Sequence, residues 1–146
     1  MRLYLDTSVL TVYLFGRDRE PDRYPHTLRL FDEINAGRAD GLVSHYALQE
    51  IFAFCQDNFP EQDVEEVAAL AFRDLFQNRL RVCGMLTRQQ KVLNARQFSI
   101  EDPSDLPYAL TAHLQRCDAL VTYDGHFVSI ADQIVVFTPE DWIALQ

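Results

Sequence analysis

The sequence predicts an α/β protein, a three-layer α/β/α sandwich around a mostly parallel sheet of roughly five strands. Short apolar runs alternate along the chain with longer segments in which apolar residues recur at helical spacing. Strands separated by helices join through right-handed crossovers, which gives a parallel sheet covered on both faces. With 146 residues, 48% of them hydrophobic, the chain is the size of one domain over residues 1–146.

The expected strands are short, apolar and bounded by turn residues or caps. They lie at residues 2–5, 42–43, 80–83, 119–123 and 134–137. The last two are separated by a short turn that contains Gly125.

The expected helices carry apolar residues at helical spacing. They lie at residues 9–15, 28–37, 47–55, 61–77, 87–98, 105–115 and from 139 onward. Thr7 or Ser8 is expected to cap the first helix, Gly37 to end the second and Ser44 to cap the third. The acids early in 61–77 match the helix dipole. Ser104 is expected to cap the helix that begins at 105, because Pro107 then falls in its first turn.

Composition restricts the classes of function. The formal net charge of −9 argues against broad electrostatic adhesion to nucleic acid, so any contact with RNA must be local. The cysteines Cys55, Cys83 and Cys117 are widely spaced, without a Cys-x-x-Cys pair, and are expected to be buried free thiols in a reducing cytosol. No secretory leader or membrane-spanning run is recognisable, so we expect a soluble cytoplasmic protein.

Four acids stand at the ends of predicted elements. Asp6 closes the first strand, Glu50 lies in the helix after the second, Asp105 opens a helix and Asp124 closes a late strand. Sites in parallel sheets lie at the carboxyl ends of the strands, so these side chains are expected to converge. Gathered carboxylates repel one another unless protons or cations compensate, and Mg²⁺ or Mn²⁺ suits oxygen ligands. Singly, each acid is equally well explained as a cap or a surface charge.

The ordered set of motifs resembles the PIN-domain family, and more closely its VapC-like toxin ribonucleases. The resemblance covers nearly the whole chain: Asp6-Thr7-Ser8 after the first strand, a helical glutamate at Glu50, and the Asp105 helix leading to a Val-Thr-x-Asp segment that ends at Asp124. It implies that the four acids are catalytic and bind one or two Mg²⁺ or Mn²⁺ ions. In that chemistry, hydroxide from a metal-bound water attacks the phosphodiester in line and the 3′ oxygen leaves.

The resemblance also implies supporting residues and leaves one ligand open. Thr7, Ser8 and Thr122 are candidates for contacts with ligands or metal-bound water. Residues 106–108 depart from the family pattern, which commonly has alanine, an aliphatic residue and often histidine there. Glu101 or Asp102 therefore remains an alternative or additional ligand beside Asp105.

A local RNA contact is expected in a segment that contains basic residues and no acid. The candidates are Arg79, Arg81, Arg88, Lys91 and Arg96. A solvated helix face explains the same residues. His126 is expected to be a solvated turn residue, with contact to phosphate as the alternative.

The leading interpretation is a Mg²⁺- or Mn²⁺-dependent endoribonuclease, the toxin of a type II toxin–antitoxin pair. By resemblance it forms a homodimer and receives a cognate antitoxin segment across a groove built from Phe15, Phe52, Phe54 and Phe59, although core packing explains the same aromatic residues. The alternatives are an RNA-processing nuclease without a toxin role and a catalytically silent RNA- or protein-binding module. A receiver domain is disfavoured, because it needs a lysine on a late strand and Lys91 is the chain's only one.

Overall fold

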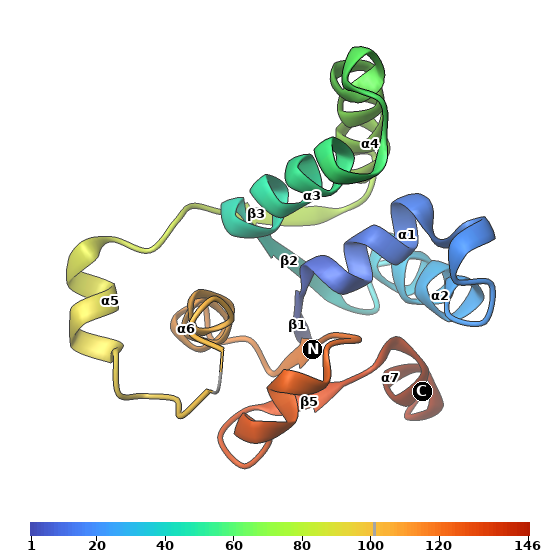
Figure 1. The fold of residues 1–146 in the computed structure, drawn as a ribbon. Coiled ribbons are helices and arrows are strands. Elements are labelled where there is room, and N and C mark those ends of the chain that lie inside the picture. Colours follow the sequence, from blue (N-terminus) through green and yellow to red (C-terminus); the bar gives the residue numbers. More distant parts are fainter. Residues whose placement is uncertain (101) are drawn as a thin grey trace.

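A five-stranded parallel sheet forms the centre of the computed structural model, which describes residues 1–100 and 102–146 (Figure 1). The strands are β1 (Arg2–Leu5), β2 (Asp40–Ser44), β3 (Leu80–Cys83), β4 (Ala119–Val121) and β5 (Val135–Phe137). Their order is β3-β2-β1-β4-β5, and all four neighbouring pairs are parallel. This confirms the predicted fold class.

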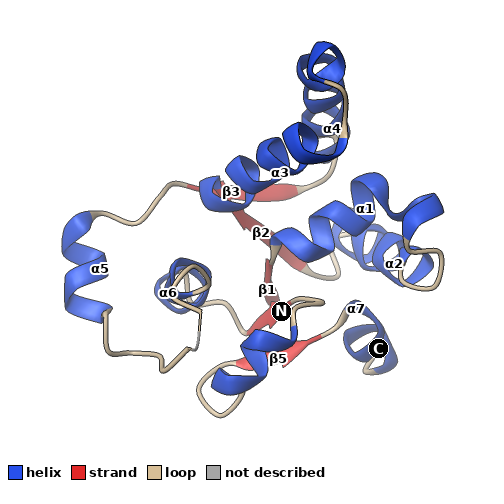
Figure 2. Ribbon diagram, viewed as in Figure 1, coloured by secondary structure: helices blue, strands red, loops and turns tan. Residues whose placement is uncertain are grey.

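Helices cover both faces of the sheet (Figure 2). One face carries α1 (Thr7–Arg19), α2 (Tyr24–Asn35), α3 (His45–Asn58), α4 (Val64–Phe76) and α7 (Pro139–Ala144). The other carries α5 (Arg88–Asn94) and α6 (Leu106–Leu114). Two 3₁₀ segments, η1 (Glu61–Asp63) and η2 (Gly125–Ile130), complete the fold. Because the chain adds β2 and β3 on one side of β1 and then β4 and β5 on the other, the topological switch point lies between β1 and β4.

Several predicted helix starts and ends are confirmed. The Ser44 hydroxyl accepts a hydrogen bond from the Ala47 amide at 3.4 Å and caps α3. Gly37 follows α2 with a φ of +75°, a left-handed conformation that glycine adopts without steric cost. The final helix begins at Pro139, where a missing amide hydrogen costs no helical bond.

Two predicted helix caps are wrong. At α1 the N-cap is Asp6 rather than Thr7 or Ser8, because Asp6 keeps an extended backbone and its carboxylate accepts from the Ser8 amide. At α6 the N-cap is Asp105 rather than Ser104, and the Asp105 side chain makes no capping bond. Both carboxylates therefore stand at the junction between a strand or loop and a helix.

Other predicted boundaries also shift. The segment expected as one helix over 61–77 divides into η1 and α4. The helix expected over 87–98 is the shorter α5, which a Thr87–Gln90 capping box begins. The expected strand 119–123 ends at Val121, and the hydroxyl of the next residue, Thr122, donates a hydrogen bond to Asp6. The turn expected at Gly125 is the 3₁₀ segment η2.

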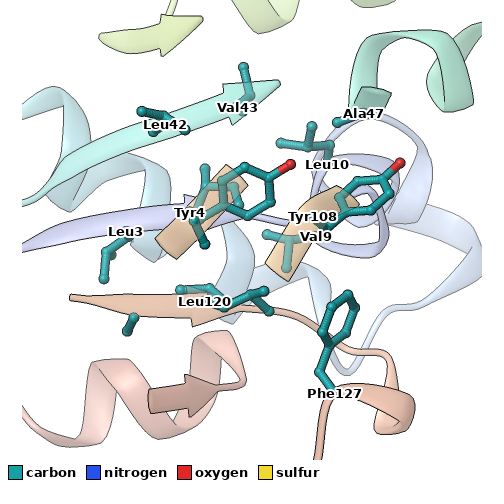
Figure 3. Close-up of a cluster of buried hydrophobic side chains, with 14 of the residues drawn as sticks. Leu3, Tyr4, Val9, Leu10, Leu42, Val43, Ala47, Tyr108, Leu120 and Phe127 are labelled. Atoms are coloured by element: carbon teal, nitrogen blue, oxygen red, sulfur yellow. The ribbon is translucent and has the colours of Figure 1, made fainter. Parts of the chain in front are cut away.

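The largest hydrophobic cluster surrounds β1 (Figure 3). Leu3, Tyr4 and Leu5 are fully buried, and Leu10 and Leu120 pack in the same cluster. Complete burial of each leucine stabilises the fold by about 1.5–3 kcal/mol. This packing makes the carboxyl end of β1 a rigid base for the residue that follows it.

Among the residues that the structure describes, no helix combines the length and apolar character needed to cross a bilayer. The three cysteines are free, as predicted. Cys55 is buried, whereas Cys83 and Cys117 are half-buried.

Candidate active site

Asp6 is buried at the carboxyl end of β1, with only 6% of its surface exposed. Its Oδ2 atom accepts three hydrogen bonds, from the Ser8 hydroxyl at 2.6 Å, the Thr122 hydroxyl at 2.8 Å and the Ser8 amide at 3.2 Å. Burial raises the pKa of Asp6, and these hydrogen bonds oppose the rise. The carboxylate is thus held in one orientation in a place that disfavours its charge.

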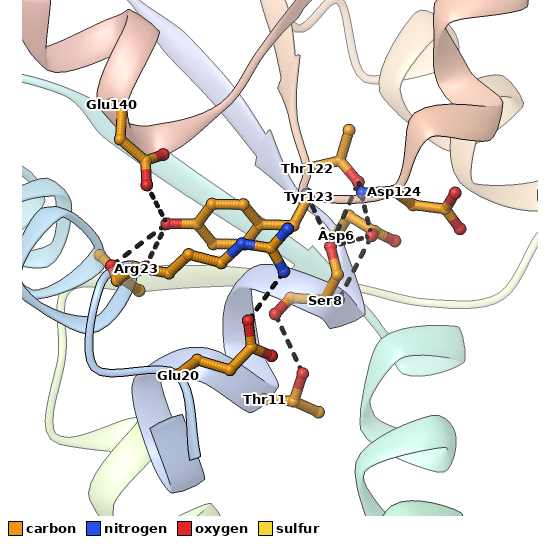
Figure 4. Close-up of polar contacts among 10 residues, drawn as sticks. Asp6, Ser8, Thr11, Glu20, Arg23, Thr122, Tyr123, Asp124 and Glu140 are labelled. Atoms are coloured by element: carbon orange, nitrogen blue, oxygen red, sulfur yellow. Dashed lines mark hydrogen bonds and ion pairs between the residues drawn. The ribbon is translucent and has the colours of Figure 1, made fainter. Parts of the chain in front are cut away.

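The Ser8 and Thr122 hydroxyls join the ends of β1 and β4 (Figure 4). The Thr122 hydroxyl accepts from the Asp124 amide at 2.9 Å while it donates to Asp6. The Ser8 hydroxyl accepts from the Tyr123 amide at 2.9 Å while it donates to Asp6. Asp6 and Asp124 therefore lie together at the switch point, linked by the Thr122 hydroxyl.

Asp105 and Asp124 lie on either side of His126. The imidazole Nδ1 is 3.4 Å from Asp105 Oδ2 and 3.5 Å from Asp124 Oδ1. Asp105 Oδ2 is buried yet makes no hydrogen bond within the described chain. Burial, reinforced by Asp124, Asp102 and Asp6, raises the pKa of Asp105 to about 6, against the lowering effect of His126. Four acids thus share one electrostatic environment.

Glu50 differs from the three aspartates in its exposure. It lies in α3 with its side chain exposed, so no burial penalty acts on its charge. It nevertheless lies near the site, because the Glu50 carboxylate and Asp6 both raise the pKa of Tyr108, although burial is the largest cause. The Tyr108 hydroxyl is itself 3.2 Å from the Thr7 hydroxyl, beside Asp6.

Of the two residues considered as alternatives to Asp105, only Asp102 lies within the described residues. Asp102 Oδ1 accepts from the Ser104 amide at 2.8 Å, and this contact lowers the pKa of Asp102. One ligand atom from each of Asp102, Asp105 and His126 falls within 4.8 Å of the others. Asp102 thus lies beside Asp105 and does not take its place. Glu101 lies outside the described residues.

The basic residues of the segment 79–96 do not form one patch. Arg79 lines a depression with Met1 and Gly37 at the amino end of the sheet, and Arg81 pairs with Asp40 at 3.4 Å. Lys91 on α5 instead stands over the Tyr46 ring, 5.5 Å from its centroid, next to the start of α3. All five candidates are exposed, but only the α5 side of the group adjoins the carboxyl end of the sheet.

Comparison with known proteins agrees with this geometry. The PIN domain family matches residues 2–126. This chain belongs to the PIN domain family. No curated protein sequence matches it. The matched residues run from the first residue of β1 to His126, and so include Asp6, Glu50, Asp105 and Asp124.

Solved structures of VapC-type proteins share the fold at low sequence identity. VapC20 of Mycobacterium tuberculosis, described as a toxin that cleaves the sarcin–ricin loop, has a TM-score of 0.65 at 16% identity, over 91% of this chain and 96% of that one. DNA-bound VapBC of Salmonella typhimurium has 0.63 at 18% identity, over 95% and 98%. VapBC2 of Rickettsia felis, bound to a promoter fragment, has 0.60 at 18% identity, over 93% and 97%.

The chemistry of this PIN domain site suits a hard divalent cation. Carboxylate oxygens are the ligands that Mg²⁺ and Mn²⁺ prefer. Within the described residues, neither lysine nor arginine forms an ion pair with any of the four acids, and a buried Asp105 oxygen has no hydrogen-bond donor. Asp6, Glu50, Asp105 and Asp124 are therefore the residues that could hold such an ion.

Two side chains in this PIN domain were not predicted to contact the acids or their neighbours. His126 bridges two of the acids, and Tyr108 places a phenol between Thr7 and Glu50. For Tyr108 a signal was available, because it lies three residues after Asp105 and such positions share one face of a helix. Nothing in the local sequence of His126 distinguishes it from a solvated turn histidine.

Proposed function

We propose that this protein is a Mg²⁺- or Mn²⁺-dependent endoribonuclease and the toxin of a type II toxin–antitoxin pair. The observation that carries the proposal is the convergence of Asp6, Asp105 and Asp124 at the carboxyl end of the sheet, where no lysine or arginine of the described residues forms an ion pair with them. Such a cluster of acids binds a divalent ion because the ion removes the repulsion that folding created. Membership of the PIN domain family supports the nuclease assignment.

In this proposal Asp6, Glu50, Asp105 and Asp124 hold one or two ions. A bound ion would lower the pKa of a coordinated water and stabilise negative charge on the scissile phosphate. Ser8 and Thr122 keep Asp6 in one orientation, because both donate to the same carboxylate oxygen. Thr7 adjoins this network through Tyr108.

The RNA strand is proposed to approach across α5. Lys91, Arg88 and Arg96 belong to this side of the molecule, and Lys91 lies above Tyr46 at the entrance to α3. Arginine and lysine neutralise phosphate locally, which a chain of net charge −9 requires. Arg79 and Arg81, at the other edge, are proposed to have no part in this contact.

The toxin assignment and the partner are proposed from the relatives. Two of the similar structures are VapBC complexes, and a third is a toxin. In this chain an apolar groove of about 410 Å³ between α3 and α4 is lined by His45, Leu48, Gln49, Phe52, Phe72 and Met85, so that of the four predicted groove aromatics only Phe52 lines it. We propose that a cognate antitoxin uses this groove, that the toxin is a homodimer, and that it acts in the cytoplasm.

The test is cleavage of a labelled RNA by the purified protein. The expected result is endonucleolytic cleavage with Mg²⁺ or Mn²⁺, loss of cleavage in excess EDTA, and recovery when Mn²⁺ is restored. Equal cleavage in EDTA would contradict the assigned chemistry, and absence of both cleavage and Mn²⁺ binding would favour the silent binding module. Growth arrest on expression, relieved by a neighbouring small reading frame, would separate a toxin from an RNA-processing nuclease.

A further inference from the structure

Tyr108 is a buried phenol at the centre of an aromatic cluster. It lies in the first turn of α6, three residues after Asp105, and only 3% of its surface is exposed. Its ring meets Tyr4 edge-on, with centroids 6.2 Å apart and planes at 80°, and meets Tyr46 at the same distance with planes at 48°. These contacts fix the ring without using its hydroxyl, so the hydroxyl is free to serve polar partners.

The hydroxyl of Tyr108 stands between two other elements. Thr7, in the first turn of α1, has its hydroxyl 3.2 Å from the phenol oxygen. On the other side is α3, where Tyr46 contacts the Tyr108 ring. Glu50 is four residues after Tyr46 and therefore on the same face of α3, toward Tyr108. The influence of the Glu50 carboxylate on the phenol agrees with this placement.

Glu50 needs such a partner more than the other three acids do. Asp6 is fixed by Ser8 and Thr122, and Asp105 and Asp124 both contact His126. Glu50 is exposed on a helix, and no ion pair within the described residues restrains it. A glutamate loses substantial rotamer freedom when it is held in one position, so a ligand left unrestrained binds a cation less well.

We propose that Tyr108 is a positioning residue that donates a hydrogen bond to the Glu50 carboxylate, while the Thr7 hydroxyl donates to Tyr108. The relay Thr7–Tyr108–Glu50 connects α1, α6 and α3 and directs the exposed acid toward the buried ones. The inference rests on the proposed metal-dependent function, because it assigns Glu50 a cation to bind. Burial keeps the phenol protonated and hence a donor, since it raises the pKa of Tyr108.

The test compares Mn²⁺ affinity, measured by calorimetry, in Tyr108→Phe, Glu50→Gln and the double variant. Tyr108→Phe retains the ring contacts and removes only the hydroxyl. We expect Mn²⁺ affinity to fall by about 10- to 100-fold, the usual effect of losing a group that orients a metal ligand. In the Glu50→Gln background the same change is expected to have no further effect, because the relay then has no carboxylate to orient.

Tyr13→Phe is the matched control. Tyr13 is another hydrogen-bonded tyrosine, which contacts Asn78 and stacks on Phe31 away from the acids. We expect its Mn²⁺ affinity to equal that of the wild type. Thr7→Val provides a second variant that removes the donor to the phenol, and a smaller fall in affinity is expected there.

Unchanged affinity in both Tyr108→Phe and Thr7→Val would overturn the relay while leaving the proposed function intact. An equal loss from Tyr108→Phe with and without Glu50 would also overturn it, because Tyr108 would then act on another ligand. A wild-type protein that neither binds Mn²⁺ nor cleaves RNA would overturn the proposed function, and the relay with it.

Discussion

The amino ends and the carboxyl ends of the parallel strands lie on opposite sides of the sheet, called here its amino edge and its carboxyl edge. The acidic side chains are paired differently at the two edges. At the amino edge, Asp40 at the start of β2 pairs with Arg2 at 3.1 Å and with Arg81 at 3.4 Å. Nearby, Asp118 accepts from the Arg2 amide at 2.6 Å, and the Arg2 guanidinium also donates to the Gln115 carbonyl. Each acid there has a partner inside the chain.

At the carboxyl edge the acids have no such partners. Asp6, Asp105 and Asp124 gather around hydroxyls and one histidine, and no lysine or arginine in the described parts of the chain pairs with them. Burial and mutual repulsion raise the pKa of Asp105 and burial raises that of Asp6. At the amino edge the acids are paired within the chain, whereas at the carboxyl edge they are left for the cation that we propose. The unpaired acids at the carboxyl edge indicate where a cation site could lie, which the net charge of the chain does not.

Removal of a single carboxylate at the carboxyl edge has the largest expected effect. Asp6→Asn keeps the shape and the Ser8 and Thr122 neighbours but removes a proposed ligand. RNA cleavage should fall by more than about 100-fold, beyond the roughly 10- to 100-fold loss typical of a residue that only supports a ligand. Cleavage rates, with circular dichroism to verify folding, provide the measurement. Full activity in this variant would remove Asp6 from the site.

Mn²⁺ binding at the carboxyl edge should raise the stability of the protein, and a substitution at the amino edge should not change this effect. At Mn²⁺ concentrations about 100 times the dissociation constant, the free energy of unfolding should rise by about 2.7 kcal/mol, which raises Tm by roughly 5–10 °C. Asp40→Asn serves as the control: it should lower metal-free stability by less than about 1 kcal/mol because its pairs are exposed, yet keep the full Mn²⁺ shift. Thermal unfolding with and without Mn²⁺ measures both. A shift that disappears in Asp40→Asn would place the ion at the wrong edge.

Acidic pH should weaken Mn²⁺ binding at the carboxyl edge. The pKa of Asp105 in the folded protein is about 6, above its ordinary value of 3.8, so protons compete with the cation below pH 6. Affinity should fall by up to about 10-fold per pH unit there. Without metal the dependence reverses: between about pH 3.8 and 6 the folded state binds more protons than the unfolded state, so stability falls as pH rises. Calorimetry across this range, repeated with Asp105→Asn, tests both. Identical profiles in the two proteins would exclude Asp105 as their source.

Basic residues at the two edges should differ modestly in RNA binding. Lys91→Ala should raise KM several-fold and reduce the slope of log affinity against log salt by about 0.7, the change expected for one phosphate contact to a single strand. Arg79→Ala, at the opposite edge, should change neither value. Filter binding at several salt concentrations is sufficient. Equal effects from the two substitutions would contradict the proposal that RNA binds at the α5 side and not at the amino edge.

Much of this architecture could be predicted from short-range patterns. The apolar run at 80–83 is β3 with the expected bounds, and Ser44 caps α3 as expected. These features depend on side chains within a few residues of one another, which is the range over which helical spacing and capping act. The errors at the start of α1 and α6 arose because Asp, Thr, Ser and Pro all suit several neighbouring positions at a helix start.

The sequence by itself determined the succession of strands and helices along the chain and placed four acids at or near their ends. The tertiary structure alone decided that Thr122 orients Asp6, that His126 bridges Asp105 and Asp124, and that Tyr108 lies between Thr7 and Glu50. It also divided one run of basic residues between two edges of the sheet. The reason is that periodicity and capping report only on neighbours along the chain. Apart from the contact of His126 with Asp124, these contacts join residues 21 to 116 positions apart, whose distance is set by packing of the crossovers.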